Sequence, residues 1–389
     1  MTDIQTGRQP AYLDSNEALA ETCRELSGKS ALGFDSEFIR TNTYYPKPGL
    51  FQLEDGEESF LVDPLAIDEW EGFKRLLINE STTVIMHSCS EDLGLLGSFL
   101  GVLPRTLFDT QRAAAFTGQG YSLSYQALVK NELDIDIPKG ETRSDWLRRP
   151  LSETQLEYAA LDVEYLVELQ QLLEDKLRKR DMLEWFEQDC RDLLANVPDE
   201  TNTAAWENAY QSIASAWQLD EPALRLLQKL AYWREQEARL RDKPKSWIIR
   251  DPELLTLASQ LPGTGTIDEA DIRRTDVFPA RFVDREARQL TRFLNGDFAA
   301  REPAKPGLVS KPLGGSARKQ LKTLQKLTRD KAEELDISPE LLARKRLWVE
   351  LLENQARGDI EFWPPGLNNW RRELLEPGVM AILSPGSSR

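Results

Sequence analysis

The sequence has 389 residues, about the length of two or three domains, and its 40% apolar and 29% charged residues are typical of a globular protein. No apolar run approaches the ~18–20 residues that cross a bilayer, and the first residues carry neither the basic nor the apolar part of a secretion signal, so we expect a cytoplasmic protein. The formal net charge of −16 argues at first sight against a nucleic-acid-binding protein.

Short apolar runs that are typical of strands precede and then alternate with helical patterns in the first third of the chain. The runs with strand character are 31–39, 50–53, 60–62 and 83–86. Two stretches, 69–79 and 91–100, have apolar residues at the three- and four-residue spacing of helices. Strands that first follow one another and then alternate with helices predict an α/β domain with a mixed sheet.

From about residue 150 onward the strand signal nearly disappears. Residues 154–194 have a strong helical pattern, and 198–203 has the composition of a domain boundary. Several further helices are expected over 204–294. The stretch 301–316, with three prolines and three glycines, predicts a linker, and 319–370 predicts a second helical block.

The basic residues are concentrated after the first half of the chain. Residues 1–200 have 19 basic and 38 acidic side chains, net −19, whereas the remaining 189 residues have 30 and 27, net +3. Residues 225–250 hold eight basic and three acidic side chains. The basic run 311–329 has no acid at all, and its basic members are Lys311, Arg318, Lys319, Lys322, Lys326 and Arg329. Each stretch is either a solvated helix face or a surface for a polyanion.

Histidine is nearly absent, which limits the chemistry open to the chain. The single histidine, His87, argues against His-based zinc hydrolases, Ser-His-Asp triads and nucleases with a pair of catalytic histidines. The three cysteines are scattered and match no metal or disulfide pattern. A hydrolase of this composition would have to use carboxylates, most simply with metal ions that prefer oxygen ligands.

Two carboxylates lie close together on the first predicted strand. Residues i and i+2 of a strand point to the same face, so Asp35 and Glu37 present their side chains together. The apolar residues around them predict a central strand, where unpaired carboxylates are costly unless a cation compensates them. Taken alone, the pair favours an exposed strand edge with ordinary acids, and a metal site is the alternative.

Two further acids follow on predicted helices. Asp92 lies in the first turn of a helix with Ser90 as its expected N-cap, a place where acids are common because they suit the helix dipole. Tyr158 and Asp162 lie four residues apart on one helix face, where they can bind a metal and orient a water or simply share a hydrogen bond. We expect His87 to be a packing or loop residue rather than a ligand.

Taken together, these motifs resemble the DEDD superfamily of 3′→5′ exonucleases, in its tyrosine-bearing subgroup. The first motif is FDSEF at 34–38, the second HSCSEDL at 87–93 and the third YAALD at 158–162. The segments 109–111 and 144–151 are also similar to that family.

The resemblance extends past the nuclease motifs to the rest of the chain. Residues 206–295 and, in a more diverged form, 317–375 resemble HRDC helical domains. The implied fold class is α/β, with a ribonuclease H-like nuclease domain on a mixed sheet followed by two all-α HRDC-like domains. The implied boundaries are 1–197 for the nuclease, 204–298 for the first helical domain, 299–316 for a linker and 317–389 for the second helical domain.

The resemblance also implies the chemistry. Two divalent metal ions, Mg²⁺ with Mn²⁺ also active, would be held by Asp35, Glu37, Asp92 and Asp162, and Tyr158 would orient the attacking water. The enzyme would release nucleoside 5′-monophosphates from RNA 3′ ends, chiefly in the maturation of tRNA precursors, with other small structured RNAs as further substrates. The basic run 311–329 and the basic helices of 225–250 would bind the RNA. Neither a membrane nor an obligate protein partner is implied.

Two other interpretations remain open. A 3′→5′ DNA exonuclease could use the same metal site, although the chain has no polymerase or helicase sequence. A non-catalytic RNA-binding scaffold with a relic nuclease fold is the second, although all five site residues are present and a relic would usually have lost at least one carboxylate.

Overall fold

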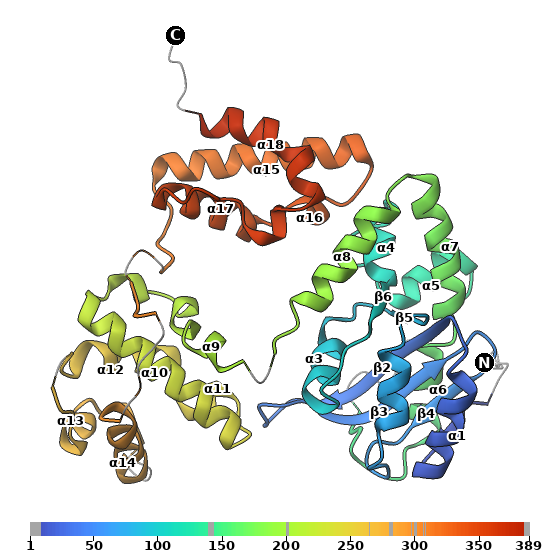
Figure 1. Ribbon diagram of the computed structural model, residues 1–389, viewed down its shortest axis with the longest axis horizontal. Coiled ribbons are helices and arrows are strands. Elements are labelled where there is room, and N and C mark those ends of the chain that lie inside the picture. Colours follow the sequence, from blue (N-terminus) through green and yellow to red (C-terminus); the bar gives the residue numbers. More distant parts are fainter. Residues whose placement is uncertain are drawn as a thin grey trace. The chain divides into compact units, whose positions relative to one another are not determined.

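The chain divides into two compact units in the computed structural model, shown in Figure 1. The first unit comprises residues 1–39, 46–198 and 315–389, and the second comprises 40–45 and 199–314. The structure describes residues 9–138, 144–199, 202–263, 265–279, 283–296, 298, 302–305, 307 and 309–384. The predicted linker 299–316 and the predicted boundary at 198–203 lie partly outside the described residues. The expected domain boundaries therefore stay predictions.

The first unit is built on a six-stranded mixed sheet with the strand order β1-β4-β3-β2-β5-β6. Its strands are β1 (Ala11–Leu13), β2 (Ala31–Ile39), β3 (Lys47–Glu54), β4 (Ser59–Val62), β5 (Thr83–Met86) and β6 (Thr106–Asp109). β3 is antiparallel to both of its neighbours, whereas the other three pairs are parallel. The predicted mixed sheet is confirmed, and the four predicted strands correspond to β2, β3, β4 and β5.

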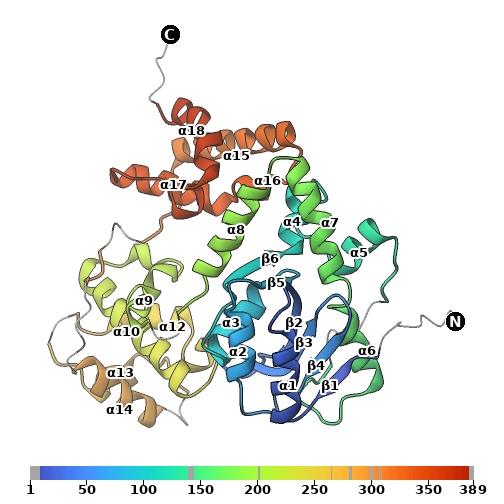
Figure 2. The same cartoon turned by 45° about the vertical axis from the view of Figure 1, so that its right-hand side comes forward.

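Helices cover the two faces of this sheet, as Figures 1 and 2 show. They are α1 (Asn16–Leu26), α2 (Glu71–Leu77), α3 (Ser90–Phe99), α4 (Thr110–Phe116), α5 (Tyr125–Leu133), α6 (Glu153–Leu161), α7 (Leu166–Lys179) and α8 (Leu183–Ala195). The helical pattern predicted for 154–194 is confirmed and comprises the three helices α6, α7 and α8. Asp181, in the left-handed region with φ of 58°, lies in the break between α7 and α8.

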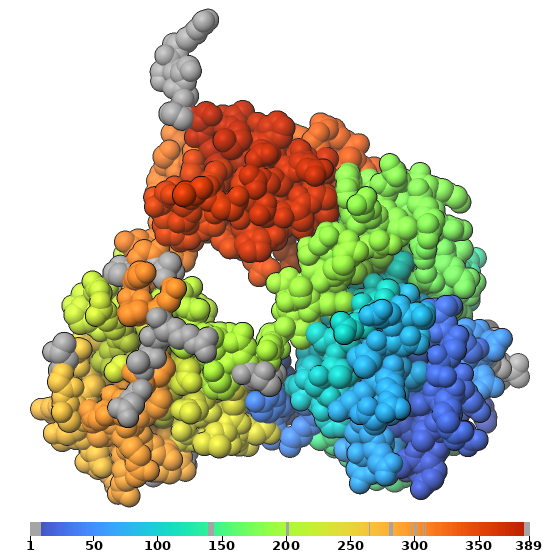
Figure 3. All heavy atoms as spheres, in the orientation of Figure 1, coloured from blue at the N-terminus to red at the C-terminus, as the bar shows by residue number. Residues whose placement is uncertain are grey.

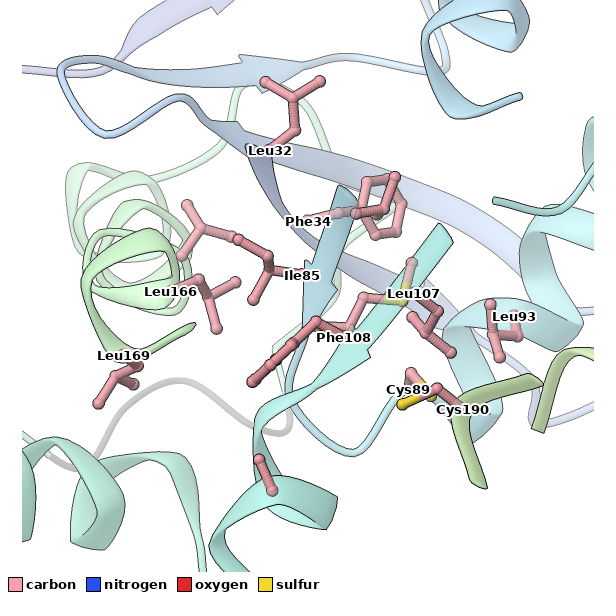
Figure 4. Packing of buried hydrophobic residues seen from close by; sticks show 14 of the residues in the cluster. Leu32, Phe34, Ile85, Cys89, Leu93, Leu107, Phe108, Leu166, Leu169 and Cys190 are labelled. Carbon is pink, nitrogen blue, oxygen red and sulfur yellow. The ribbon is translucent and has the colours of Figure 1, made fainter. Parts of the chain in front are cut away.

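Alternating side chains of β2 point to opposite faces of the sheet. Phe34 packs against Phe73 of α2, with ring centroids 6.4 Å apart. Gly33 faces α7 instead, and a Cβ placed on it would lie 3.1 Å from Cβ of Leu166. In Figure 4, Ile85 of β5 is on the side of Leu166, and Phe34 points the other way. The sheet is therefore packed on both faces, which explains the continuous apolar character of its central strands.

The described residues of the second unit from 202 onward form helices and connecting loops, without a strand. Its helices are α9 (Thr203–Trp206), η1 (Ala209–Ser212), η2 (Ala216–Gln218), α10 (Glu221–Leu240), α11 (Lys245–Ile248), α12 (Asp251–Gln260), α13 (Glu269–Arg274) and α14 (Val283–Leu294). Asp220 caps α10 by accepting a hydrogen bond from the Ala223 amide at 3.0 Å. Trp233, in the middle of α10, is buried in the core of this unit.

The C-terminal helices of the chain belong to the first unit. They are α15 (Gly315–Leu335), α16 (Pro339–Leu342), α17 (Lys345–Arg357), η4 (Pro365–Leu367) and α18 (Trp370–Leu383). Trp370 stacks on Trp185 of α8, with centroids 4.8 Å apart and an interplanar angle of 7°. The buried guanidinium of Arg371 pairs with Asp189 of α8 at 2.6 Å. Figure 3 shows the atoms of α8 and the C-terminal helices in contact. That 317–389 is a second HRDC-like domain stays a prediction.

No helix in the described part of the chain has the length and apolar content needed to cross a membrane.

Candidate active site

β2 presents the first two acids of the site. It is a central strand, as predicted, hydrogen-bonded to β3 on one side and β5 on the other. Asp35 lies opposite Gln52 and Glu37 opposite Leu50 in the antiparallel register with β3. Because side chains alternate along a strand, the two carboxylates point to the same face, away from the aromatic cluster around Phe34.

α3 brings the third acid. Asp92 is buried in the first turn of this helix, and the hydroxyl of Ser36, which lies between the two acids of β2, donates a hydrogen bond to it. The N-cap of the helix is Cys89, and Ser90 is the first helical residue, so the prediction of Ser90 as N-cap is wrong. The Cys89 amide instead donates to Oδ2 of Asp109 at 2.9 Å, which fixes the chain where the helix begins.

α6 brings the fourth acid and the tyrosine. A capping box formed by Ser152 and Gln155 fixes its first turn, and Asp162 is its C-cap. Tyr158 and Asp162 share one face of the helix, as predicted, and the phenol donates a hydrogen bond to the carboxylate. Ala159, which follows the tyrosine, is fully buried, so its small side chain lets the helix pack closely.

The segment before α6 orients the tyrosine from the side. The ring of Trp146 packs on that of Tyr158, with centroids 6.2 Å apart. A Cβ on Gly49 would lie 2.6 Å from Cβ of Trp146, so only glycine allows this approach. Arg149 anchors the same segment, with Nε donating to Oδ2 of Asp63 at 2.6 Å and Nη2 donating to the Gly49 carbonyl at 2.6 Å. Sequence reasoning missed Asp63, because it is 86 residues away from Arg149.

The four acids are close enough to act on one another. Burial raises the pKa of Asp35 well above its usual range, and the charges of Asp92, Asp162 and Glu37 raise it further. Burial, together with the charges of Asp162 and Asp92, raises the pKa of Glu37 to about 8. Burial also raises the pKa of Asp92 and of Asp162, against the hydrogen bonds from Ser36 and Tyr158. Carboxylates from three separate elements thus converge on one place.

Tyr158 stays protonated in this setting. Burial raises the pKa of its phenol, and the neighbouring negative charge of Asp162 raises it further. The hydroxyl is therefore a neutral hydrogen-bonding group at neutral pH.

The donors of this site suit a hard divalent cation. All four acids offer only carboxylate oxygens, the ligands that Mg²⁺ and Mn²⁺ prefer. A cation would also offset the charges of Asp92 and Asp162, which raise the pKa values of Asp35 and Glu37. No group of three or more His, Cys, Asp or Glu side chains within the described ranges could hold a metal ion as they stand. Two of the four acids are turned to other partners, because Asp92 accepts from Ser36 and Asp162 from Tyr158.

His87 is not part of this group. Its Nδ1 lies 2.9 Å from the hydroxyl of Thr110, and its Nε2 lies 3.0 Å from the carbonyl of Leu123. Burial lowers the pKa of its imidazole, so the ring is neutral. As predicted, His87 is a packing and loop residue, because it directly follows β5 and its ring packs against Tyr125 with centroids 5.6 Å apart.

The basic run 311–329 lies almost entirely on α15. Five of its six basic side chains are on this helix, Lys311 lies four residues before it, and all six are exposed. Lys326 pairs with Asp330 at 2.5 Å. The opposite side of the helix is buried through Leu321, Leu324 and other residues. An RNA-binding role for this surface stays a prediction.

Without metal, the chain should lose stability as the pH rises. The folded chain holds the Glu37 proton up to about pH 8, whereas the unfolded chain releases it near the ordinary value of 4.5. The folded state therefore binds more protons between these two values, so the free energy of unfolding falls through this window and levels off above it. Melting temperatures in chelator from about pH 5 to about pH 9 measure this fall. Glu37→Gln should reduce this fall in melting temperature, whereas the exposed control Glu157→Gln should leave it unchanged. Equal curves of melting temperature against pH for the wild type and both variants would refute the expectation.

The chain is similar to known proteins over nearly its whole length. A model of the 3′-5′ exonuclease family matches residues 10–178, and a model of the HRDC domain matches residues 223–292. The ribonuclease D of Pseudomonas paraeruginosa is 37% identical over 388 residues, which cover 97% of this chain and 98% of that protein. The ribonuclease D of Escherichia coli is 34% identical over 380 residues, covering 95% and 97%.

A solved structure is similar over the same length. The crystal structure of Escherichia coli RNase D, described as an exoribonuclease involved in structured RNA processing, matches with a TM-score of 0.84 and 32% sequence identity. The match covers 96% of this chain and 98% of that one.

Proposed function

Because the chain belongs to the ribonuclease D family of 3′→5′ exoribonucleases, we propose that its four converging carboxylates hold two divalent metal ions at the 3′ end of an RNA strand. These carboxylates are Asp35, Glu37, Asp92 and Asp162. The observation that carries the proposal is their convergence, since the charges of Asp92 on α3 and Asp162 on α6 raise the pKa values of the two buried acids of β2. Such a cluster is stable in the ionised form only with a compensating cation.

Each protein group has a distinct part in this proposal. When bound, the metal ions would activate the attacking water and stabilise the charge on the leaving 3′-oxygen. Tyr158, kept neutral, would hold the water in line for attack through its hydroxyl. Trp146 fixes the direction of the phenol, and Ser36 fixes the carboxylate of Asp92 until the ions bind.

The substrate and conditions follow from the family. The chain acts on RNA, and we propose 3′-extended tRNA precursors as its main substrates and other small structured RNAs as further ones. We also propose that Mg²⁺ is its metal ion in the cell, that Mn²⁺ can substitute for it, and that the enzyme works in the cytoplasm. The similarity to an RNase D that takes part in structured RNA processing supports the choice of substrate.

An assay on matched strands tests the proposed substrate. The purified chain with Mg²⁺ is given a 3′-extended tRNA precursor, an unstructured RNA of equal length and a DNA strand of the same sequence. We expect release of nucleoside 5′-monophosphates from both RNAs, with higher kcat/KM for the precursor. A preference for DNA would favour the DNA exonuclease interpretation, and binding without release would favour the relic scaffold.

Replacing basic residues of α15 should weaken binding of long RNA. Arg318, Lys319 and Lys322 are exposed and have no ion-pair partner within the described part of the chain. Each lost phosphate contact lowers the slope of log K against log salt by about 0.7 for single strands, so the triple change to glutamine should lower it by about 2 and raise KM for a tRNA precursor. KM over a salt series measures both; equal slopes would show that α15 does not bind the RNA.

Substitutions are better suited to this test than removal of the C-terminal helices. Trp370 and Leu341 belong to the same buried core as Phe186 of α8, so a truncated chain would expose apolar surface of the nuclease. Loss of stability would then be confused with loss of RNA binding.

A further inference from the structure

A polar pocket lies in the first unit, between the start of α3, the start of α4 and the C-terminal helices. Its volume is about 320 Å³, and its lining includes Arg112, Tyr121, Arg344, Ser88 and Ser90. None of the four proposed metal ligands lines it. We call it the two-arginine pocket.

Two guanidinium groups share one aromatic ring in this pocket. Arg344 lies over Tyr121 at 4.9 Å from the ring centroid and donates a hydrogen bond to its hydroxyl, and Arg112 lies 5.6 Å from the same centroid. Arg112 is 3.5 Å from Asp189. Arg344 has no carboxylate within ion-pair distance among the residues that the structure describes. It is therefore a cation whose charge the protein leaves uncompensated.

Positive charge dominates the surroundings of Arg344. Partial burial lowers the pKa of its guanidinium, and so do the charges of Arg112, Arg346 and Arg371. Asp189 is already shared between Arg371, at 2.6 Å, and Arg112. Three of these cations, Arg344, Arg346 and Arg371, come from the part of the chain after residue 200, which carries net +3. An anion in the pocket would relieve their repulsion.

The acidic residue that lines the pocket, Asp109, already accepts two hydrogen bonds. Asp109 accepts from the amide of Cys89 through Oδ2 at 2.9 Å and from the amide of Arg112 through Oδ1 at 2.8 Å. Each of its oxygens is thus held by a backbone donor, which reduces its repulsion of a second anion. The hydroxyls of Ser88 and Ser90 are exposed and have no hydrogen-bond partner in the described part of the chain, so they are free to donate.

The pocket adjoins the proposed metal site along one helix. Ser90 is the first residue of α3, a ten-residue helix, and Asp92 lies two residues later in the same turn. Two residues of α-helix span about 3 Å along the axis. Side chains two residues apart on a helix point to different sides, so an RNA strand that reaches Asp92 from the pocket would pass over the N-terminus of α3.

We propose that the two-arginine pocket binds a backbone phosphate of the RNA strand whose 3′ end is at the metal site. Guanidinium groups bind phosphate oxygens through two parallel hydrogen bonds, and the hydroxyls of Ser88 and Ser90 add further donors. This inference rests on the proposed function, because it assumes that RNA reaches Asp92. A free nucleoside 5′-monophosphate has the same phosphate chemistry and is the alternative source.

Arg344→Gln in the full chain tests the inference, with Lys345→Gln as a matched control. Lys345 is the next residue, is exposed and does not line the pocket. RNA affinity is measured in chelator, so that cleavage does not enter. We expect Arg344→Gln to weaken binding of a tRNA precursor about tenfold and to lower the salt slope by about 0.7, while Lys345→Gln has less than about a twofold effect. Equal losses of RNA affinity in Arg344→Gln and Lys345→Gln would overturn the inference, since they would show only a general effect of removing one positive charge.

A second variant and a nucleotide-binding measurement distinguish the remaining results. Arg344→Lys keeps the charge but loses the paired donors, so it should restore the salt slope and only part of the affinity. If Arg344→Gln abolishes binding of adenosine 5′-monophosphate and leaves RNA affinity unchanged, the RNA assignment is wrong. Melting temperatures check that each variant is folded. Wild-type cleavage with Mg²⁺ is assayed in parallel; its absence would contradict the proposed function, whereas unchanged RNA affinity of Arg344→Gln contradicts only the pocket.

Discussion

Asp162→Asn should abolish hydrolysis while leaving the fold intact. The amide keeps the shape of the side chain and its contact with Tyr158, but it removes one of the four charges proposed to hold the metal ions. Loss of an essential ligand costs several kcal/mol of transition-state stabilisation, and each ~1.4 kcal/mol is a factor of ten, so we expect kcat to fall by about 10³ or more. The rate of nucleotide release from a short RNA with Mg²⁺ measures this.

The thermal stability of the same variant provides a second check. Removing one charge from a repelling group should leave the melting temperature in chelator unchanged or higher, because Asp162 raises the pKa of both Asp35 and Glu37. Asp175→Asn, an exposed acid on α7, is the matched control and should keep full activity. More than about a tenth of the wild-type kcat in Asp162→Asn would contradict the assignment of Asp162 as an essential ligand.

Tyr158→Phe should lower kcat by about 10²–10³ while metal binding is retained. The phenol is neutral and hydrogen-bonded to Asp162, so its hydroxyl supplies orientation rather than charge. Phenylalanine preserves the packing on Trp146 and removes only that hydroxyl. Single-turnover rates on a short RNA and calorimetric titration with Mn²⁺ measure the two quantities separately.

Tyr165→Phe is the control for this substitution. The hydroxyl of Tyr165 has no hydrogen-bond partner in the part of the chain that the structure describes, so its loss should leave kcat within about a factor of two. If Tyr158→Phe lost metal affinity and kept kcat, the proposed role of the phenol in orienting the water would be wrong.

Local patterns were sufficient to predict the central parts of the fold and of the site. Alternation along β2 predicted that Asp35 and Glu37 share a face, and the four-residue spacing on α6 predicted the pairing of Tyr158 with Asp162. β1 and β6 were not predicted. β1 has only three residues, and β6 has only two apolar residues, Leu107 and Phe108, between polar ones, whereas the short strands β4 and β5 each carry three apolar residues in a row.

Contacts between distant segments could not be predicted from periodicity. Ser36 donates to Asp92 across 56 residues, and Arg371 pairs with Asp189 across 182 residues. The separate helical block expected at 319–370 shares a core with the nuclease because Trp370 stacks on Trp185, a contact that depends on tertiary packing alone. The two-arginine pocket has the same origin, since Arg112 and Arg344 meet only through this packing.

The most direct test of the central claim, that the four carboxylates act through divalent metal ions on an RNA 3′ end, is a time course on a 3′-end-labelled tRNA precursor. The wild-type chain is assayed with Mg²⁺, with chelator, and with Mg²⁺ restored. The account predicts stepwise release of nucleoside 5′-monophosphates from the 3′ end with Mg²⁺, none in chelator, and full recovery on restoration. Release that continues in chelator, or cleavage at internal positions, would contradict it.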